Sequence, residues 1–213
     1  MDAELGLRER KKKQTRQVIA EAALRLFNER GFDAVTVAQV ARAADVSDAT
    51  VFNYFPTKES LFFGQMQTFE EALIQAVHER RGGESVLAAF RRFIDEGSER
   101  LAAESTAAAI SMAARIVGCS PSLRAREREI VADSTDALAL LLAEEAGSPP
   151  DDIEPWVVAN ALMGAHRAIV SQVRAEVRAG RRGPALAAES RSQIERVFAT
   201  LERGLEHYGV RQA

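Results

Sequence analysis

The 213-residue chain is poor in the residues that define several classes of protein. A single cysteine, Cys119, excludes an internal disulfide, and three histidines far apart in the sequence lack the spacing of a zinc site. The longest apolar run, Ala137 to Ala143, is far shorter than the roughly 20 residues of a membrane helix. The sequence therefore argues against a disulfide scaffold, a metal module and a membrane-spanning protein.

Glycine and proline are also scarce, with 13 and 6 residues, whereas alanine, leucine, glutamate and arginine fill long stretches. This composition favours helix, so we expect an all-α protein with little or no sheet. The N-terminus lacks the apolar block of a secretory signal, which predicts a cytoplasmic protein. No nucleophile-base pair, phosphate-binding glycine loop or carboxylate pair indicates catalysis, so we expect no enzyme, no catalytic residue and no cofactor.

The charges are unevenly distributed, although the net charge is only −3. Residues 1–63 carry a net +1 and the remainder a net −4. Basic residues are concentrated in Arg8 to Lys13 and at Arg16, ahead of the first apolar periodicity. We interpret residues 1–12 as a basic flexible tail, which is either a solvated segment or one that attracts an anionic partner.

Four helices are predicted after this tail, from apolar spacing and capping residues. Thr36 and Gln39 fit a capping box, in which each side chain accepts a backbone N–H of the other residue. Ser47 and Thr57 are good N-caps for the two helices that follow. The second and third helices are short and closely spaced, as in a helix-turn-helix. The predicted ranges are 18–31, 37–44, 48–54 and 57–78.

The rest of the chain is predicted to form further helices separated by short turns. Proline or glycine marks most of the breaks, as at Gly183-Pro184. We expect a helical head over 13–60, with its own aromatic core, and a helical body over 61–213. The predicted helices of the body are 85–102, 105–118, 121–146, 151–179 and 184–208.

Many residues of the head recur at fixed spacing in one family pattern. They are Ala22-Ala23, Leu26-Phe27, Gly31-Phe32, Thr36-Val37, Val40-Ala41, Ala44-Asp45-Val46-Ser47, Thr50-Val51-Phe52-Asn53-Tyr54-Phe55 and Thr57-Lys58-Glu59. With this pattern, residues 16–61 resemble the DNA-binding head of TetR-family transcriptional regulators. The resemblance implies a three-helix helix-turn-helix head that a linking helix joins to a C-terminal ligand-binding and dimerisation domain.

Two residues depart from that pattern. Asp45 stands where the family usually has glycine, at a turn position that is expected to need a positive φ. Phe52 stands where the family often has tyrosine, and we expect its ring to belong to the core of the head.

A reading helix must present small or polar side chains to base edges in the major groove. Val46, Val51 and Phe55 are expected to face the core instead. Asp48 has two interpretations, because its carboxylate suits a helix start but can also accept from cytosine. The candidate base-reading residues are Ser47, Asp48, Ala49, Thr50 and Asn53, and the candidate phosphate contacts are Thr36, Tyr54, Lys58, Lys12 and Lys13.

Two stripes of the body predict a homodimer, in agreement with the resemblance. Either they pair with a second copy in a four-helix bundle, or they face the core of their own subunit. The first consists of Ile194, Val197, Phe198, Leu201, Leu205 and Tyr208, and the second of Ala161, Gly164, Ala165 and Ala168.

The resemblance also implies a small-molecule effector, for which a hydrophobic or acyl-chain compound is our first hypothesis. The resemblance thus implies a repressor that such a ligand releases from a palindromic operator. A DNA-binding regulator controlled by a protein partner or by its own concentration is the alternative, and an enzyme is a remote one. The candidate ligand-binding residues are Phe90, Phe93, Met112, Arg115, Trp156, Asn160, Met163 and His166.

Overall fold

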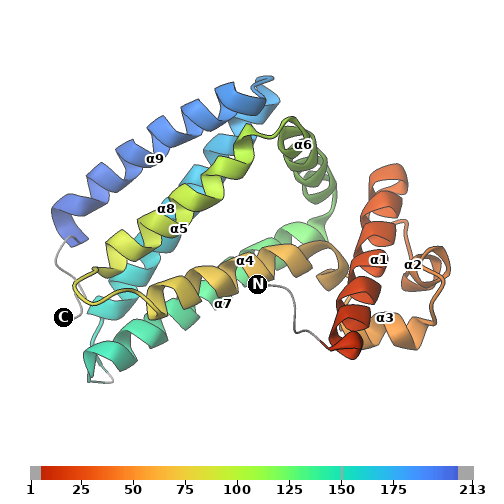
Figure 1. Ribbon diagram of the computed structural model, residues 1–213, viewed down its shortest axis with the longest axis horizontal. Coiled ribbons are helices and arrows are strands. Elements are labelled where there is room, and N and C mark those ends of the chain that lie inside the picture. Colours follow the sequence, from red (N-terminus) through yellow and green to blue (C-terminus); the bar gives the residue numbers. More distant parts are fainter. Residues whose placement is uncertain (1–5, 150, 206–213) are drawn as a thin grey trace. The chain divides into compact units, whose positions relative to one another are not determined.

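The computed structural model describes residues 6–149 and 151–205, and this part of the chain is helical without a strand (Figure 1). The all-α prediction is therefore confirmed. The helices are α1 (Leu7–Arg30), α2 (Val37–Ala43), α3 (Asp48–Tyr54), α4 (Ser60–His78), α5 (Val86–Ser98), the 3-10 helix η1 (Glu99–Ala102), α6 (Glu104–Cys119), α7 (Pro121–Ala146), α8 (Glu154–Arg178) and α9 (Gly183–Leu205).

Helix α1 begins at Leu7 and not at Val18, where the apolar periodicity starts. Arginine, lysine and glutamate are good helix formers, so the basic segment extends the helix although it has no apolar side to bury. Residues 7–12 of the predicted flexible tail are thus helical, which corrects that expectation. Residues 1–5 lie outside the described part of the chain.

Most other helix boundaries agree with the prediction to within a few residues. The predicted helix 85–102 divides into α5 and the 3-10 helix η1. Helix α8 begins at Glu154 rather than at residue 151, and the Asp152 carboxylate accepts the backbone N–H of Glu154 at 2.9 Å. The predicted end of the last helix, Tyr208, lies outside the described residues.

The chain divides into two compact units, which we describe separately. The first unit consists of Met1–Gln67 and Arg115–Glu127, and the second of Thr68–Ala114 and Arg128–Ala213. We expected one boundary, between residues 60 and 61. The first unit differs because it includes the corner between α6 and α7, where Ser120 Oγ donates to Asp33 Oδ1 at 2.8 Å.

The core of the first unit is aromatic. Phe27 and Phe32 lie 4.9 Å apart between ring centroids, so the chain folds back on α1 after Gly31 as expected. Phe62 of α4 lies 6.5 Å from Phe27. The buried side chains around these rings are Ile19, Ala23, Leu26, Val35, Val40, Ala41, Val51, Phe55, Leu61 and Phe63.

The turn between α2 and α3 depends on Asp45. Its φ is 53°, and no other described non-glycine residue has a positive φ. The expectation of a left-handed residue at this position is confirmed. Aspartate adopts this conformation at a cost on the order of 1 kcal/mol, which glycine would avoid.

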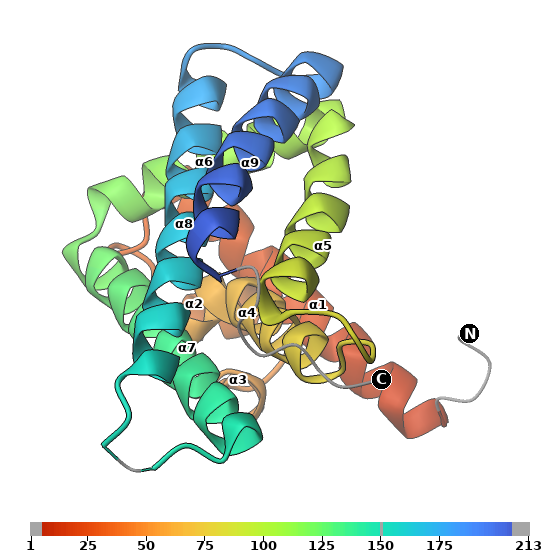
Figure 2. The ribbon, with the colours of Figure 1, turned by 90° about the vertical axis from the view of Figure 1, so that its left-hand side faces the viewer.

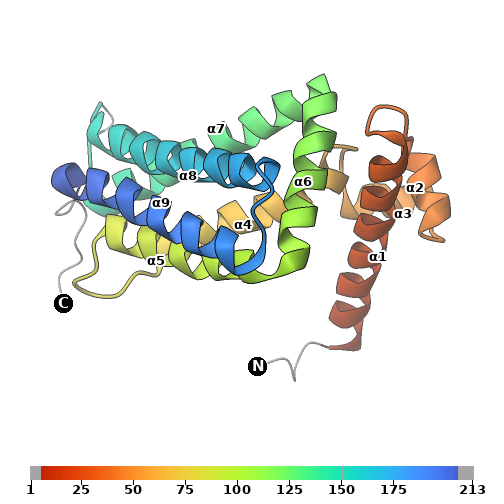
Figure 3. The same cartoon turned by 90° about the horizontal axis from the view of Figure 1, so that it is seen from above.

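The second unit has a single large apolar core, to which α4, α5, α7, α8 and α9 contribute. Helices α5, α8 and α9 lie side by side, as two perpendicular views show (Figure 2 and Figure 3). Its most completely buried large apolar side chains are Leu73, Phe90, Leu138, Leu162, Met163, Leu186, Ile194 and Phe198.

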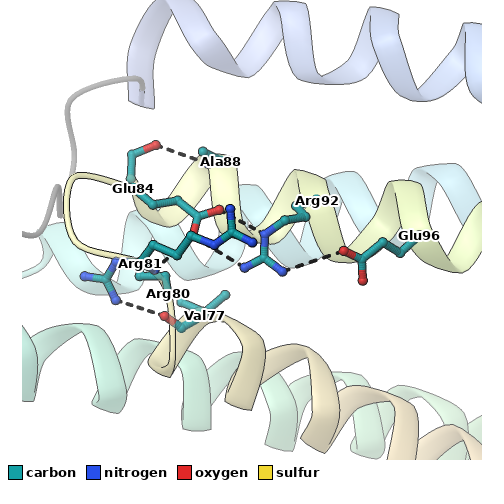
Figure 4. Close-up of polar contacts among 8 residues, drawn as sticks. Val77, Arg80, Arg81, Glu84, Ala88, Arg92 and Glu96 are labelled. Atoms are coloured by element: carbon teal, nitrogen blue, oxygen red, sulfur yellow. Dashed lines mark hydrogen bonds and ion pairs between the residues drawn. The ribbon is translucent and has the colours of Figure 1, made fainter.

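The connection from α4 to α5 is held by ionic and capping contacts (Figure 4). Glu84 accepts from Arg92 at 3.0 and 3.4 Å, and it also accepts the backbone N–H of Arg81 at 3.0 Å. The Arg92 guanidinium keeps the pKa of Glu84 below its ordinary value. Ser85 then caps α5 by accepting the N–H of Ala88 at 3.1 Å. Together these contacts fix the start of α5.

Candidate nucleic-acid interface

Helices α2 and α3 are short, and each begins at a side-chain cap. In the predicted capping box, Gln39 N–H donates to Thr36 Oγ1 at 3.3 Å and Thr36 N–H to Gln39 Oε1 at 2.9 Å, so this prediction is confirmed. Ser47 Oγ accepts the N–H of Thr50 at 3.1 Å and caps α3. The two helices and the turn at Asp45 form a helix-turn-helix.

Helix α3 has a buried side and an exposed side. Val51 is fully buried, and Phe55, the residue after the helix, is 2% exposed. Val46, the third residue predicted to face the core, is only partly buried. The residues on the opposite side are exposed, and they are Asp48, Ala49, Phe52 and Asn53.

The candidate base-reading residues differ in whether their polar atoms already form hydrogen bonds within the protein and in how exposed they are. The hydroxyls of Ser47 and Thr50 lie 2.8 Å apart and bond to each other, and Thr50 is partly buried. Ala49 and Asn53 are exposed and lie one helical turn apart. Asp48 occupies the first turn of the helix, where a carboxylate is electrostatically favoured.

Phe52 does not belong to the core, because it is 49% exposed. The expectation that its ring packs inside the head is wrong. Position 52 follows the buried Val51 and is rotated by about 100° around the helix, which places it toward solvent. An aromatic side chain signals burial only where the helical periodicity agrees with it.

The candidate phosphate contacts lie on four parts of the first unit. The Lys58 ammonium lies 4.3 Å from the centroid of the Phe32 ring, which orients the charge. Thr36 is exposed at the start of α2, and Tyr54 is partly buried at the end of α3. Lys12 and Lys13 are exposed on α1, within a run of exposed side chains from residue 9 to 14.

Arg16 has a role that the sequence did not reveal. Its Nη1 donates to the backbone oxygen of Tyr54 at 2.9 Å, and its guanidinium lies 4.5 Å from the centroid of the Phe55 ring. A Cβ at Gly64 would lie 3.3 Å from Arg16 Nη2, so a glycine leaves space for this arrangement. Arg16 therefore connects α1 to the C-terminal end of α3. Arg16 and Tyr54 are 38 positions apart in the sequence, so helical spacing does not predict the contact.

Replacing Arg16 by alanine is expected to destabilise the protein by about 1–2 kcal/mol, because a charge-assisted hydrogen bond and a cation–π contact are lost. Since the loss loosens the end of α3, affinity for a specific DNA site should fall more than affinity for random DNA. Urea unfolding and binding to both DNAs measure the two effects. Arg25→Ala, at an exposed position of the same helix, is the matched control, and equal effects of the two variants would contradict this role.

The eight candidate ligand-binding residues lie in different environments. Arg115 belongs to the first unit, where its Nη2 donates to Asn28 Oδ1 at 2.6 Å. Trp156 and Asn160 are exposed near the start of α8, and the Asn160 amide donates to the Trp156 carbonyl at 2.8 Å. Met112 is partly buried on α6.

Two of the remaining candidates fill the core of the second unit. Phe90 is fully buried and lies 6.3 Å from Phe198 between ring centroids, and Met163 is 2% exposed. Their side chains are thus occupied by packing within the subunit.

Phe93 and His166 converge on Phe69 of α4. The Phe93 ring lies 5.1 Å from the Phe69 ring, and the His166 ring stacks on Phe69 at 5.5 Å. Burial lowers the pKa of His166 from 6.5 to about 4, so its imidazole is neutral near pH 7. We name Phe69, Phe93 and His166 the aromatic cluster; it joins α4, α5 and α8.

The two predicted dimer stripes have different environments. Ile194 and Phe198 of α9 are buried in the core of their own subunit, which contradicts the expectation for these residues. Ala168 of α8 is exposed, and a Cβ added at Gly164 would meet nothing within 4 Å. Tyr208 lies outside the described residues.

Two other kinds of site were sought in the described part of the chain. Within residues 6–149 and 151–205, no three acidic, histidine or cysteine side chains are placed to hold a metal ion. No helix there is long and apolar enough to cross a membrane.

Comparison with known proteins assigns both parts of the chain. Residues 19–64 match the family of bacterial regulatory proteins described as the tetR family, and residues 84–205 match the MftR C-terminal domain. The chain is 32% identical over 152 residues to the HTH-type transcriptional regulator TcmR of Streptomyces glaucescens, a match that covers 69% of this chain and 67% of TcmR.

Solved structures show the same fold. NalD, the secondary repressor of the MexAB-OprM multidrug efflux pump in Pseudomonas aeruginosa, is similar with a TM-score of 0.58 and 21% identity over 88% of this chain and 96% of NalD. FadR of Bacillus subtilis, in complex with stearoyl-CoA, has a TM-score of 0.51 and 22% identity over 86% of this chain and 97% of FadR.

The helix-turn-helix head and the helical body define a DNA-binding transcriptional regulator. The chain belongs to the TetR family, with a C-terminal domain of the MftR type. Its relatives named here are regulators rather than enzymes.

Proposed function

We propose that the protein is a homodimeric repressor that binds a near-palindromic operator and is released by a small apolar ligand. The observation that carries the proposal is the geometry of α3. Val51 and Phe55 anchor the helix in the core, while Ala49 and Asn53 are held outward. One such helix in each of two symmetry-related subunits would read two half-sites about 34–36 Å apart.

The exposed side of α8 supports a dimer. Ile153 is 72% exposed and Val157 55%, and with Trp156 they place apolar surface at the start of the helix. Further along the same side, Gly164 would let a second helix approach closely. In this proposal two copies of α8 pack against each other around a two-fold axis, so the interface contains each residue twice.

The aromatic cluster is our proposed point of ligand action. It consists of partly buried rings, with a neutral imidazole that offers one hydrogen-bond donor and one acceptor. A ligand with an extended apolar part would replace ring contacts, and a single polar group could bond to His166. FadR, a structural neighbour, holds stearoyl-CoA, which makes an acyl thioester a reasonable first probe.

Helix α4 would transmit the effect of the ligand. Residues of α4 up to Gln67 belong to the first unit, and those from Thr68 onward belong to the second. Phe69 belongs to α4, so displacing its ring would shift this helix. Helix α4 begins at Ser60, whose backbone N–H donates to Thr57 Oγ1, and Thr57 lies shortly after the end of α3. The ligand must bind the DNA-free state more tightly, and by linkage DNA must weaken ligand binding by the same factor, typically about 5–150-fold.

A second candidate is a regulator that needs no small ligand. It is favoured by Phe90 and Met163, because both are completely packed within the core. Such a protein would respond to a protein partner or to its own concentration.

Site selection from random DNA, followed by titration with stearoyl-CoA, tests the proposal. We expect the selected sites to be near-palindromic and stearoyl-CoA to lower operator affinity at least about 5-fold, whereas free coenzyme A does not. The affinity for stearoyl-CoA, measured with and without operator, should change by the same factor. Equal affinities in both states, for this probe and for shorter acyl chains, would favour the second candidate.

A further inference from the structure

Phe52 is a large apolar side chain in an unusual place. Among the residues of the first unit whose side chains are described, only Val18 and Phe52 are large apolar side chains with substantial exposure, at 42% and 49%. Val18 lies on α1, whereas Phe52 lies on the outward side of α3. Phenylalanine has no hydrogen-bonding atom, so Phe52 can contribute to DNA binding only through apolar contact.

The neighbours of Phe52 on α3 indicate which part of DNA it meets. Asp48 lies one turn before it, at i−4, and its carboxylate is repelled by phosphates. Ala49, at i−3, is small and leaves the ring accessible. This flank of α3 therefore suits base edges better than the sugar-phosphate backbone.

The major groove offers one prominent apolar group, the C5-methyl of thymine. We infer that Phe52 recognises a thymine in each half-site by packing its ring against that methyl group. The inference rests on the proposed function, because it assumes that α3 enters the major groove. It makes Phe52 a specificity-determining residue that acts through apolar contact.

Deoxyuridine tests this inference, because it differs from thymidine only by lacking the C5-methyl group. Sites are first selected from random DNA with the unaltered protein. The preferred site is then synthesised with dU in place of dT at one symmetric pair of positions at a time. We expect one pair to lower affinity by about 15-fold, which corresponds to about 4-fold for each buried methyl.

Two variants show whether Phe52 is the residue responsible. Phe52→Ala should bind the dT and dU forms of that site equally. Val18→Ala, which removes an exposed apolar side chain on α1, should keep the full difference. Because the difference is measured first with the unaltered protein, it does not depend on how well a variant folds.

Each remaining outcome overturns a defined claim. A selected site whose dU forms all bind as tightly as the dT form would overturn the role of Phe52 and leave the proposed function standing. A dU penalty that persists in Phe52→Ala would assign the methyl contact to another residue. If no sequence is enriched from random DNA, both the proposed function and this inference fail.

Discussion

Gly164→Leu is expected to convert a dimer into folded monomers. A Cβ at this position meets nothing within 4 Å of its own subunit, so the new side chain enters open space in the protomer. Leucine is also a better helix former than glycine by about 0.8–1 kcal/mol, which should stabilise α8. In the proposed dimer the same side chain enters the contact between two α8 helices and holds them apart.

The expected effect is large because an isologous interface contains the substitution twice. Overpacking costs about 1–3 kcal/mol at each site, so the dimer should weaken by roughly 2–6 kcal/mol. Sedimentation equilibrium measures the change in dimer affinity, and far-UV circular dichroism verifies the fold. Gly118→Leu is the matched control, since Gly118 is an exposed glycine of α6 with equally open space. Unchanged dimer affinity in Gly164→Leu would place the interface elsewhere.

His166→Phe is expected to remove a pH-dependent loss of stability. The folded-state pKa of His166, about 4, lies below the ordinary value of 6.5 because the charged imidazole is poorly solvated. The unfolded chain therefore binds the proton more readily between these two pH values. The free energy of unfolding should be unaffected by His166 above about pH 6.5 and should fall as the pH decreases toward 4.

Between pH 7.5 and pH 5 this contribution amounts to at most about 2 kcal/mol. Phenylalanine keeps a ring against Phe69 without a titratable group, so the variant should lose that much less stability over the same interval. Urea unfolding at fixed protein concentration and at the two pH values measures the difference. His78→Gln, which removes the contact between His78 Nδ1 and Glu145 Oε1 at 3.2 Å, measures separately the contribution of the histidine on α4. Equal losses in His166→Phe and the unaltered protein would show that His166 is not desolvated.

The reading helix was largely predictable, because its determinants are local. Ser47 specifies the start of α3 through its own cap, and the left-handed conformation of Asp45 follows from the turn. The position of Phe52 required more than composition, since its exposure is set by the register of α3 against the core. Periodicity alone could have placed it beside the outward residues.

Contacts between distant parts of the sequence were not predictable. Nothing near Arg16 indicates that it bonds to the carbonyl of Tyr54, and nothing near Arg115 indicates Asn28. The convergence of Phe93 and His166 on Phe69 likewise depends on how three helices pack. A stripe of apolar residues also cannot distinguish an internal core from a dimer contact, as Ile194 and Phe198 show.

The corner between α6 and α7 determines which segments a chimaera between this protein and a relative must take together. Residues 115–127 belong to the first unit, and Leu123 within them is fully buried. A chimaera that takes only residues 1–67 from this chain would carry Asn28 and Asp33 without Arg115 and Ser120, their partners. Recombination that respects the fold would transfer both segments together. The first unit is thus encoded by two separate segments of the gene. A substitution at the α6–α7 corner therefore changes the unit that contains the helix-turn-helix.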